Sequence, residues 1–193
     1  RLDTLPDGTS AASLACTDMA LDLGGIAKGY AVDCAFDRLR ATQETDFLIN
    51  LGGNIRACGT PGAGRDGWRI GVRDPFRRDG LLGTVTLADG EAVATSGNYE
   101  RFVELAGTRY AHIIDPRSGR PVRGMAGVTV LAPTAAAADA LSTTLFVLGA
   151  EEGRRLLERT PGCHALWVTD ETPPRLIPSP GFAARFAPEQ IRK

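Results

Sequence analysis

The sequence is poor in the side chains that build thiolate and imidazole metal centres. No two of its four cysteines form a CxxC pair, and its only two histidines lie far apart in the 193 residues. This pattern argues against a thiolate metal site. Single thiols in a chain of this length fit a reducing compartment better than a disulfide scaffold. The residues concerned are Cys16, Cys34, Cys58, Cys163, His112 and His164.

Long apolar runs and an excess of one charge are also absent. No window approaches the run of about 18 apolar residues that a membrane-spanning helix needs. The 22 Lys and Arg residues and the 23 Asp and Glu residues are interspersed and give a formal net charge of −1. Non-specific nucleic-acid binding requires a basic stripe, so we exclude DNA and RNA as the main partners.

What remains is ordinary globular material, with 43% hydrophobic and 23% charged residues. This length and composition predict a single domain over residues 1–193. The chain begins at Arg1 without a basic-then-apolar signal pattern. We therefore expect a fragment whose N-terminal portion is missing, which leaves a cytoplasmic location and a periplasmic, membrane-anchored one both open.

Periodicity predicts helices and strands in an α+β order. Apolar residues recur at i+4 from Ile26, which predicts a helix to about Arg40. Thr134 can cap a second helix to about Leu148, and residues 151–160 fit a short amphipathic helix. Residues 5–10 fit a hairpin or loop, and strands are predicted at 20–23, 47–53 (as a buried strand), 54–60, 67–74, 81–89, 91–97, 99–105, 109–115, 126–133, 164–170 and 174–179. The fold class is α+β, with helices packed on a largely antiparallel sheet.

The segment LDLGGIAKG has the features of an anion site at the start of a helix. Gly24 and Gly25 let the backbone turn, and the free N–H groups of the following helix then face whatever lies in front. Lys28 adds a full positive charge, and Asp22 can accept hydrogen bonds from a ligand. The alternative is a simple strand-to-helix turn with a solvated lysine.

The helix TAAAADALSTTLFVL carries a carboxylate among apolar residues. Asp139 and Thr143 are four residues apart and therefore face the same way. A carboxylate and a hydroxyl oxygen are ligands that Mg²⁺ accepts, together with water, a backbone carbonyl and phosphate oxygens. In the alternative interpretation, Asp139 binds a buried arginine or a backbone amide, and Thr143 bonds back into the helix.

A third segment, RYAHIIDPRSGRPV, combines a strand with a turn. We expect the strand to bring His112 inward beside Tyr110, and DPRSG to form the turn that follows. A histidine on a strand usually has a structural role. Near a phosphate it can instead act as a base or as a donor to a phosphate oxygen.

Together these segments resemble the FAD:protein FMN transferases, the ApbE family once described as thiamine biosynthesis lipoproteins. The resemblance covers about residues 21–149 and rests on five ordered motifs: LDLGGIAKGYAVD, INLGGN, ATSGNYERF, HIIDPRSGRPV and DALSTTLFVLG. It implies an ApbE-like fold and a Mg²⁺-dependent reaction. FAD is split at its pyrophosphate, FMN is joined to a threonine or serine hydroxyl of a client flavoprotein, and AMP leaves.

The resemblance also implies residue roles. Asp22 and Lys28 would contact FAD, and the backbone around Ile113 would touch the flavin nucleotide. Lys28 and His112 would assist catalysis, His112 by helping to remove the client's proton. The metal would be held by the Gly25 carbonyl, Asp139 and Thr143, with Ser142 as an additional oxygen.

One departure from the family pattern leaves other functions open. The family usually has a long N-terminal portion that helps to hold FAD, and this sequence has no counterpart of it. Membrane attachment would depend on that portion. Water in place of the client hydroxyl would make the protein a Mg²⁺-dependent FAD pyrophosphatase that yields FMN and AMP. A non-catalytic flavin-binding or assembly module is the other alternative.

Overall fold

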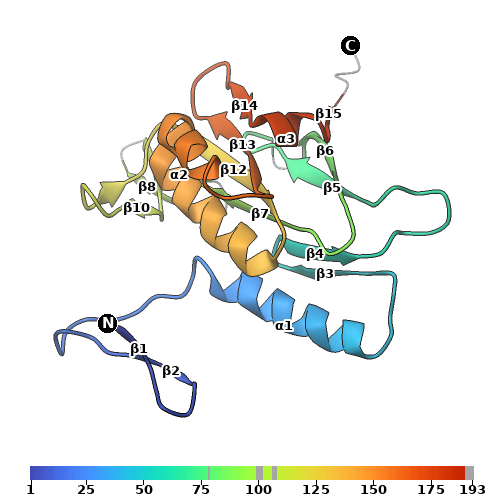
Figure 1. The fold of residues 1–193 in the computed structure, drawn as a ribbon. Coiled ribbons are helices and arrows are strands. Elements are labelled where there is room, and N and C mark those ends of the chain that lie inside the picture. Colours follow the sequence, from blue (N-terminus) through green and yellow to red (C-terminus); the bar gives the residue numbers. More distant parts are fainter. Residues whose placement is uncertain (78, 99–101, 106–107, 190–193) are drawn as a thin grey trace.

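The computed structural model describes residues 1–77, 79–98, 102–105 and 108–189. Its strands pair in the antiparallel direction in every described ladder. Two long helices lie against one face of the main sheet, and a smaller sheet lies on the other side (Figure 1). The predicted α+β class and largely antiparallel sheet are therefore confirmed.

The main sheet has six strands in the order β14-β13-β12-β7-β4-β3. Strand β12 is the longest, and its neighbours β7 and β13 pair with it on either side. The strands are β3 (Phe47–Leu51), β4 (Asn54–Cys58), β7 (Ala92–Gly97), β12 (Met125–Ala132), β13 (His164–Thr169) and β14 (Leu176–Pro178).

Four smaller units complete the strands. A three-stranded sheet has the order β15-β6-β5, and three hairpins pair β1 with β2, β8 with β9 and β10 with β11. Figure 1 shows the β1–β2 hairpin standing apart from the body of the protein. The strands are β1 (Leu2–Thr4), β2 (Ser10–Ala12), β5 (Trp68–Arg73), β6 (Leu81–Leu87), β8 (Phe102–Leu105), β9 (Thr108–Ala111), β10 (Ile114–Asp115), β11 (Arg120–Pro121) and β15 (Phe186–Pro188).

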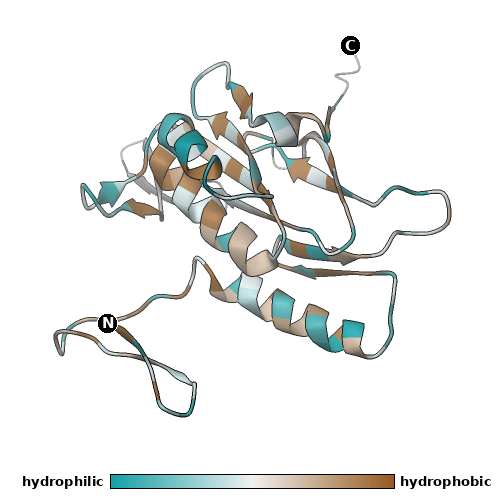
Figure 2. Cartoon of the chain, viewed as in Figure 1, coloured by the Kyte–Doolittle hydropathy of each residue, from teal (hydrophilic) through white to brown (hydrophobic). Residues whose placement is uncertain are grey.

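Helices α1 (Ala27–Ala41) and α2 (Ala135–Leu157) pack against each other, and α3 (Pro180–Ala183) is a single turn. Thr134 caps α2 as predicted, because its Oγ1 accepts from Ala137 N at 3.2 Å. Gly149 leaves the helical conformation with φ 72°, so α2 consists of two predicted helices joined at a kink. Figure 2 shows more hydrophilic residues on α1 than on the first turns of α2.

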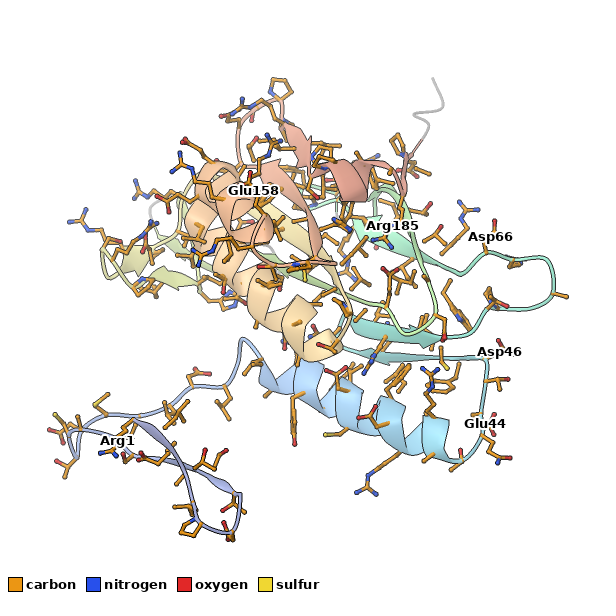
Figure 3. The ribbon with its side chains drawn as sticks, viewed as in Figure 1. Arg1, Glu44, Asp46, Asp66, Glu158 and Arg185 are labelled. Atoms are coloured by element: carbon orange, nitrogen blue, oxygen red, sulfur yellow. The ribbon has the colours of Figure 1, made fainter. Side chains whose placement is uncertain are left out.

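Alternation along the strands builds a core on each face of the main sheet. Val128 and Val130 of β12 pack on the helix side, and Leu131 packs on the other side with the three-stranded sheet. Trp167 extends the helix-side core and donates from Nε1 to Leu145 O of α2 at 3.2 Å. Figure 3 labels Glu44 and Asp46 on the connection from α1 to β3.

The predicted strands at 20–23 and 47–53 differ from the structure, and the one at 109–115 is interrupted between Ala111 and Ile114. Residues 20–23 form no strand, because they are exposed and no neighbouring strand pairs with them in the described part of the chain. Residues 47–51 form a strand at the edge of the sheet rather than a buried one, since only β4 pairs with it. Residues 99–101 of another predicted strand lie outside the described residues.

No helix among the described residues is long and apolar enough to cross a membrane.

Candidate active site

The turn before α1 is organised by Asp22. Its Oδ1 accepts a hydrogen bond from Gly24 N at 2.7 Å, which forms an Asx-type turn. Asp22 itself is exposed. Leu23 O then accepts from Ile26 N and Ala27 N at 3.0 and 2.8 Å and starts the helix. Ile26 occupies the N-cap position without a side-chain cap. The first turn of α1 is therefore left without a capping carboxylate or hydroxyl at its own N-cap.

A glycine brings α1 against the start of α2. A Cβ on Gly29 would collide with the backbone oxygen of Ala135, so only glycine allows this approach. The close approach places Gly29 N at 2.9 Å from Asp139 Oδ2. The amide on the first turn of α1 therefore donates to a carboxylate of α2.

The start of α2 is closed by a carboxylate from α1. Asp33 Oδ1 accepts from Ala135 N at 2.8 Å, and its Oδ2 accepts from Ala136 N at 2.9 Å. Arg56 Nη1 also donates to Asp33 Oδ1 at 2.9 Å, and both side chains are largely buried. The guanidinium carbon of Arg56 lies 3.9 Å from the centroid of the Phe36 ring. Asp33 thus accepts the hydrogen bonds of the free N–H groups at the start of α2, to which a ligand anion would otherwise bind.

Asp139 is buried and paired, as a buried carboxylate must be. Its side chain is 5% exposed, and Lys28 Nζ lies 3.3 Å from Oδ1, whereas the Lys28 side chain is 44% exposed. Lys28 Nζ also lies 3.4 Å from Gly24 O. Lys28 is therefore ion-paired rather than only solvated, and of the two partners that the alternative interpretation gave Asp139, the backbone amide is present as Gly29 N.

Two hydroxyl groups of α2 lie near the backbone oxygen of Asp139, and a third, from β7, contacts both of them. Ser96 Oγ of β7 is 2.9 Å from Ser142 Oγ and 3.1 Å from Thr143 Oγ1. Ser142 Oγ donates to Asp139 O at 2.9 Å, and Thr143 Oγ1 lies 3.5 Å from the same oxygen. A Cβ on Gly25 would lie 3.4 Å from Thr143 Oγ1, so the glycine backbone adjoins this hydroxyl.

The structure therefore brings five predicted residues together and leaves three elsewhere or otherwise engaged. Gly25, Lys28, Asp139, Ser142 and Thr143 meet at the start of α1. Asp22 is nearby in the chain, but its carboxylate holds the turn. His112 and Ile113 lie in the segment after β9.

His112 is not on an inward-facing strand, which corrects that prediction. Strand β9 ends at Ala111, and His112 sits in an exposed bend. Ile113 is 9% exposed, its side chain belongs to the helix-side core, and its oxygen accepts from Val122 N at 3.0 Å. The side-chain direction of Tyr110 lies outside the described side chains.

The predicted DPRSG turn is present and is fixed to α2. Asp115 O accepts from Ser118 N and Gly119 N at 3.2 and 2.8 Å, and Gly119 has φ 67°. The Arg117 guanidinium joins Asp115 Oδ2 at 3.0 Å to Glu152 of α2 at 2.9 Å. Hydrogen bonds from Arg117 hold the pKa of Asp115 below its usual value, so the carboxylate stays ionised near neutral pH.

Sequence reasoning missed three polar residues of this region. Asp33 has the spacing of an ordinary solvated helix residue, and Ser96 lies inside the quoted ATSGNYERF motif without a distinguishing pattern. Asn54 of β4 is 3% exposed, and its Oδ1 has no hydrogen-bond partner within the described residues. Since Ile55 packs on the opposite face, alternation turns Asn54 toward the helices.

A hollow of about 630 Å³ opens on the other face of the main sheet. None of the predicted site residues lines it. Its lining comes from β5 and from the sheet face away from α1 and α2, and includes Ile70, Val72, Val93, Thr95 and Thr129. This hollow is therefore separate from the cluster around Asp139.

The donors around Asp139 suit a hard divalent cation. They are a carboxylate, hydroxyl oxygens and nearby glycine backbone, which are oxygen ligands of the type Mg²⁺ prefers. Across residues 1–77, 79–98, 102–105 and 108–189, no three His, Cys, Asp or Glu side chains gather to hold a metal. A cation here would rely on one carboxylate plus ligand oxygens, an arrangement common for Mg²⁺ with phosphates.

Comparisons with known proteins agree with the resemblance seen in the sequence. The model of the ApbE family matches residues 3–167. The FAD:protein FMN transferase of Klebsiella pneumoniae is 39% identical over 186 residues, covering 95% of this chain and 56% of that protein. The enzyme of the same name from Rhodobacter capsulatus is 43% identical over 151 residues, covering 78% and 28%.

Solved structures give the same result. The ApbE protein of Thermotoga maritima superimposes with a TM-score of 0.81 at 36% identity, covering 96% of this chain and 59% of that one. The flavin transferase ApbE of Vibrio cholerae gives 0.79 at 32% identity, covering 95% and 57%. The chain spans 56% of the Klebsiella relative and 28% of the Rhodobacter one. The chain belongs to the ApbE family.

Proposed function

We propose that this protein transfers FMN from FAD to a threonine or serine hydroxyl of a client flavoprotein and releases AMP. Relatives at 39% and 43% identity carry the name FAD:protein FMN transferase. The observation that carries the proposal is the meeting of Lys28, Asp139 and Thr143 at the start of α1. This arrangement combines a cation, a buried anion and hydroxyl oxygens, as a site for a pyrophosphate with its metal requires.

The reaction is a phosphoryl-type transfer. The client hydroxyl oxygen attacks the phosphorus of the FMN half, and the bond from that phosphorus to the bridging oxygen breaks. AMP leaves with the bonding electron pair, and the client's proton is lost to a base. Little covalent chemistry falls to the protein, so positioning and charge neutralisation supply most of the rate.

Lys28 neutralises phosphate charge in this proposal. Its half-exposed ammonium lies over the buried Asp139, at the border between protein and ligand. The partial positive charge at the N-terminus of α1 adds to the charge of Lys28. Asp22 fixes the turn through Gly24 and orients the nucleotide end of FAD.

Mg²⁺ is the metal that fits the oxygen donors of the site. Asp139, Thr143 and the Gly25 carbonyl would hold it, with Ser142 close by, and it would neutralise charge on the pyrophosphate. Asp139 keeps its Gly29 amide on Oδ2, so Oδ1, which contacts Lys28, is the oxygen open to exchange. A metal ion that replaces Lys28 at Oδ1 would free the Lys28 ammonium to bind a phosphate oxygen.

His112 is our candidate for the base that takes the client's proton. Its exposed position suits a group that must meet a large protein substrate rather than a small molecule. Ile113 beside it anchors this segment in the core and leaves the neighbouring backbone to contact the flavin nucleotide.

The test is to incubate the protein with FAD, Mg²⁺ and a client flavoprotein domain, and then to weigh the client. We expect a mass gain of one FMN unit, together with free AMP, and a gain slower on the order of 10²–10³-fold with Asp139→Asn. Free FMN and AMP with an unmodified client would instead favour the FAD pyrophosphatase. Flavin binding without any AMP would favour the non-catalytic module.

A further inference from the structure

We propose that Ser96 is a positioning residue that turns the hydroxyl proton of Thr143 away from the cation site. The oxygen lone pairs of Thr143 then remain available on the side of Gly25. This inference rests on the proposed function, because it concerns the cation that the Asp139 site would hold. Nothing in the five sequence motifs assigns a role to this serine.

The position of Ser96 follows from the alternation of β7. Val93 and Thr95 line the hollow on one face of the sheet, and Ala92 and Ala94 pack in the helix-side core. Ser96 therefore faces α2, where its Oγ lies 2.9 Å from Ser142 Oγ and 3.1 Å from Thr143 Oγ1. One hydroxyl thus contacts two successive hydroxyls of the helix.

The protons of these hydroxyls can be assigned by counting. A carbonyl oxygen only accepts, so Ser142 gives its single proton to Asp139 O at 2.9 Å. The contact between Ser96 and Ser142 therefore uses the Ser96 proton. With that proton committed, the contact between Ser96 and Thr143 uses the proton of Thr143.

The result is a directed chain of three hydroxyls, the Ser96 hydroxyl chain. It runs from Thr143 to Ser96, from Ser96 to Ser142, and from Ser142 to Asp139 O. The competing contact from Thr143 to Asp139 O is the longest of the set, at 3.5 Å. Only this assignment of the three hydroxyl protons gives one proton to each of the three shorter contacts.

A hydroxyl that donates into the protein presents its lone pairs on the opposite side. Gly25 adjoins Thr143, since an added Cβ would lie 3.4 Å from Oγ1, and we assign the free lone pairs to this side. A cation needs those lone pairs and is repelled by a hydroxyl proton. Ser96 therefore acts on the cation through Thr143, as groups behind the ligands of metal sites do.

The experiment measures cation affinity and not only activity. We expect Ser96→Ala to weaken Mn²⁺ binding, followed by its EPR signal, by about 10- to 100-fold, the usual effect of removing a partner of a metal ligand. Mg²⁺-linked stabilisation against heat should fall in parallel. Ser96→Thr keeps the hydroxyl on a strand that tolerates β-branching and should retain affinity within about 3-fold.

Thr144→Ala is the matched control. Thr144 is the next residue on α2 and is exposed. Its hydroxyl donates to Ala140 O, at a distance of 2.8 Å, and contacts none of the site residues through this bond. Equal Mn²⁺ affinity in Ser96→Ala and Thr144→Ala would overturn the role of Ser96 alone. Equal losses in Ser96→Ala and Ser96→Thr would also overturn it, by showing a packing effect. No Mn²⁺ binding by the parent protein would overturn the metal site itself, and the role of Ser96 with it.

Discussion

Helices α1 and α2 start beside each other (Figure 1), and their first turns differ in which amides meet a side chain. At the start of α2, Thr134 Oγ1 accepts from Ala137 N, and Asp33 accepts from the two preceding amides. At the start of α1, Ile26 supplies no side-chain cap. A carboxylate thus meets the first two amides of α2, whereas at α1 a carboxylate meets the third amide, Gly29 N, which donates to Asp139.

The difference shows where a ligand anion can bind. Where the first amides of a helix already donate to a carboxylate, they are not available to donate to a phosphate. At α1 the Asp139 carboxylate that accepts from Gly29 N is also paired with Lys28, whose side chain is 44% exposed, and glycines replace side chains in the turn before the helix. Asp33 has a structural role at one helix, and Lys28 has its proposed functional role at the other.

Removing the carboxylate at the start of α2 should have the largest effect on stability. Asp33→Ala leaves the amides of Ala135 and Ala136 without their acceptor and Arg56 without its buried partner. Breaking such a buried pair costs about 3–5 kcal/mol. Urea unfolding should show this loss in the free energy of unfolding, with a smaller loss for Asp33→Asn, which keeps an acceptor oxygen. A loss below about 1 kcal/mol in the alanine variant would contradict the role of Asp33.

Changing the buried carboxylate at the start of α1 should have the largest effect on catalysis. Asp139→Asn can keep the bond from Gly29 N but loses the charge that faces Lys28. We expect turnover to fall on the order of 10²–10³-fold, as when one transition-state stabilising group is removed. Mg²⁺-linked thermal stabilisation should disappear with it. Thr143→Val should weaken that stabilisation less, because it removes a neutral ligand. Unchanged Mg²⁺-linked melting in both variants would reject the assignment.

Removing the cation at the start of α1 should affect ligand binding more than folding. Lys28→Met is expected to weaken FAD binding by about 1–3 kcal/mol, the value of a charge-assisted hydrogen bond. The sequence alone suggested no change in stability. Because Lys28 pairs with Asp139 but is 44% exposed, we now expect a loss below about 1 kcal/mol.

Calorimetry at two salt concentrations measures the FAD affinity of this variant, with Arg38→Met on the exposed last turn of α1 as the matched control. The affinity difference should shrink at high salt. A Lys28→Met affinity equal to that of the control would remove Lys28 from the phosphate site.

The smallest effect should be on the pH dependence of stability, through the titration of His164, which is remote from both helix starts. Burial, and then the charge of Arg185 (labelled in Figure 3), lowers the pKa of His164 from its usual 6.5. The unfolded chain then binds the proton more readily than the folded one, so stability is full above the unfolded pKa and falls as pH drops below about 6.5. His164→Gln should flatten this part of the pH profile of thermal melting. An unchanged profile would show that another group causes it.

The sequence predicted the elements better than it predicted their partners. The i+4 pattern predicted α1, but its buried face consists of Gly29, Val32 and Phe36, which that pattern did not mark. A short apolar stretch at 20–23 was predicted as a strand, because local propensity carries no information on whether a neighbouring strand exists.

For the site, helical spacing predicted that Asp139 and Thr143 share a face, and both side chains lie against the start of α1, Asp139 at Lys28 and Gly29 and Thr143 at Gly25. The need of a buried carboxylate for a partner was also predictable. That Gly29 and Lys28 provide it depends on the packing of two helices more than 100 residues apart in the chain, which no local pattern encodes. Ser96 was missed for the same reason.

Anomalous diffraction from crystals grown with Mn²⁺ and FAD tests the central claim most directly. The account predicts a manganese peak between Asp139, Thr143 and the Gly25 carbonyl, with metal–oxygen distances of roughly 2.0–2.2 Å, near those of Mg²⁺. The FAD pyrophosphate should lie against it at the start of α1, within reach of Lys28. A manganese peak or a pyrophosphate elsewhere, for example in the hollow beside Thr95 and Thr129, would contradict it.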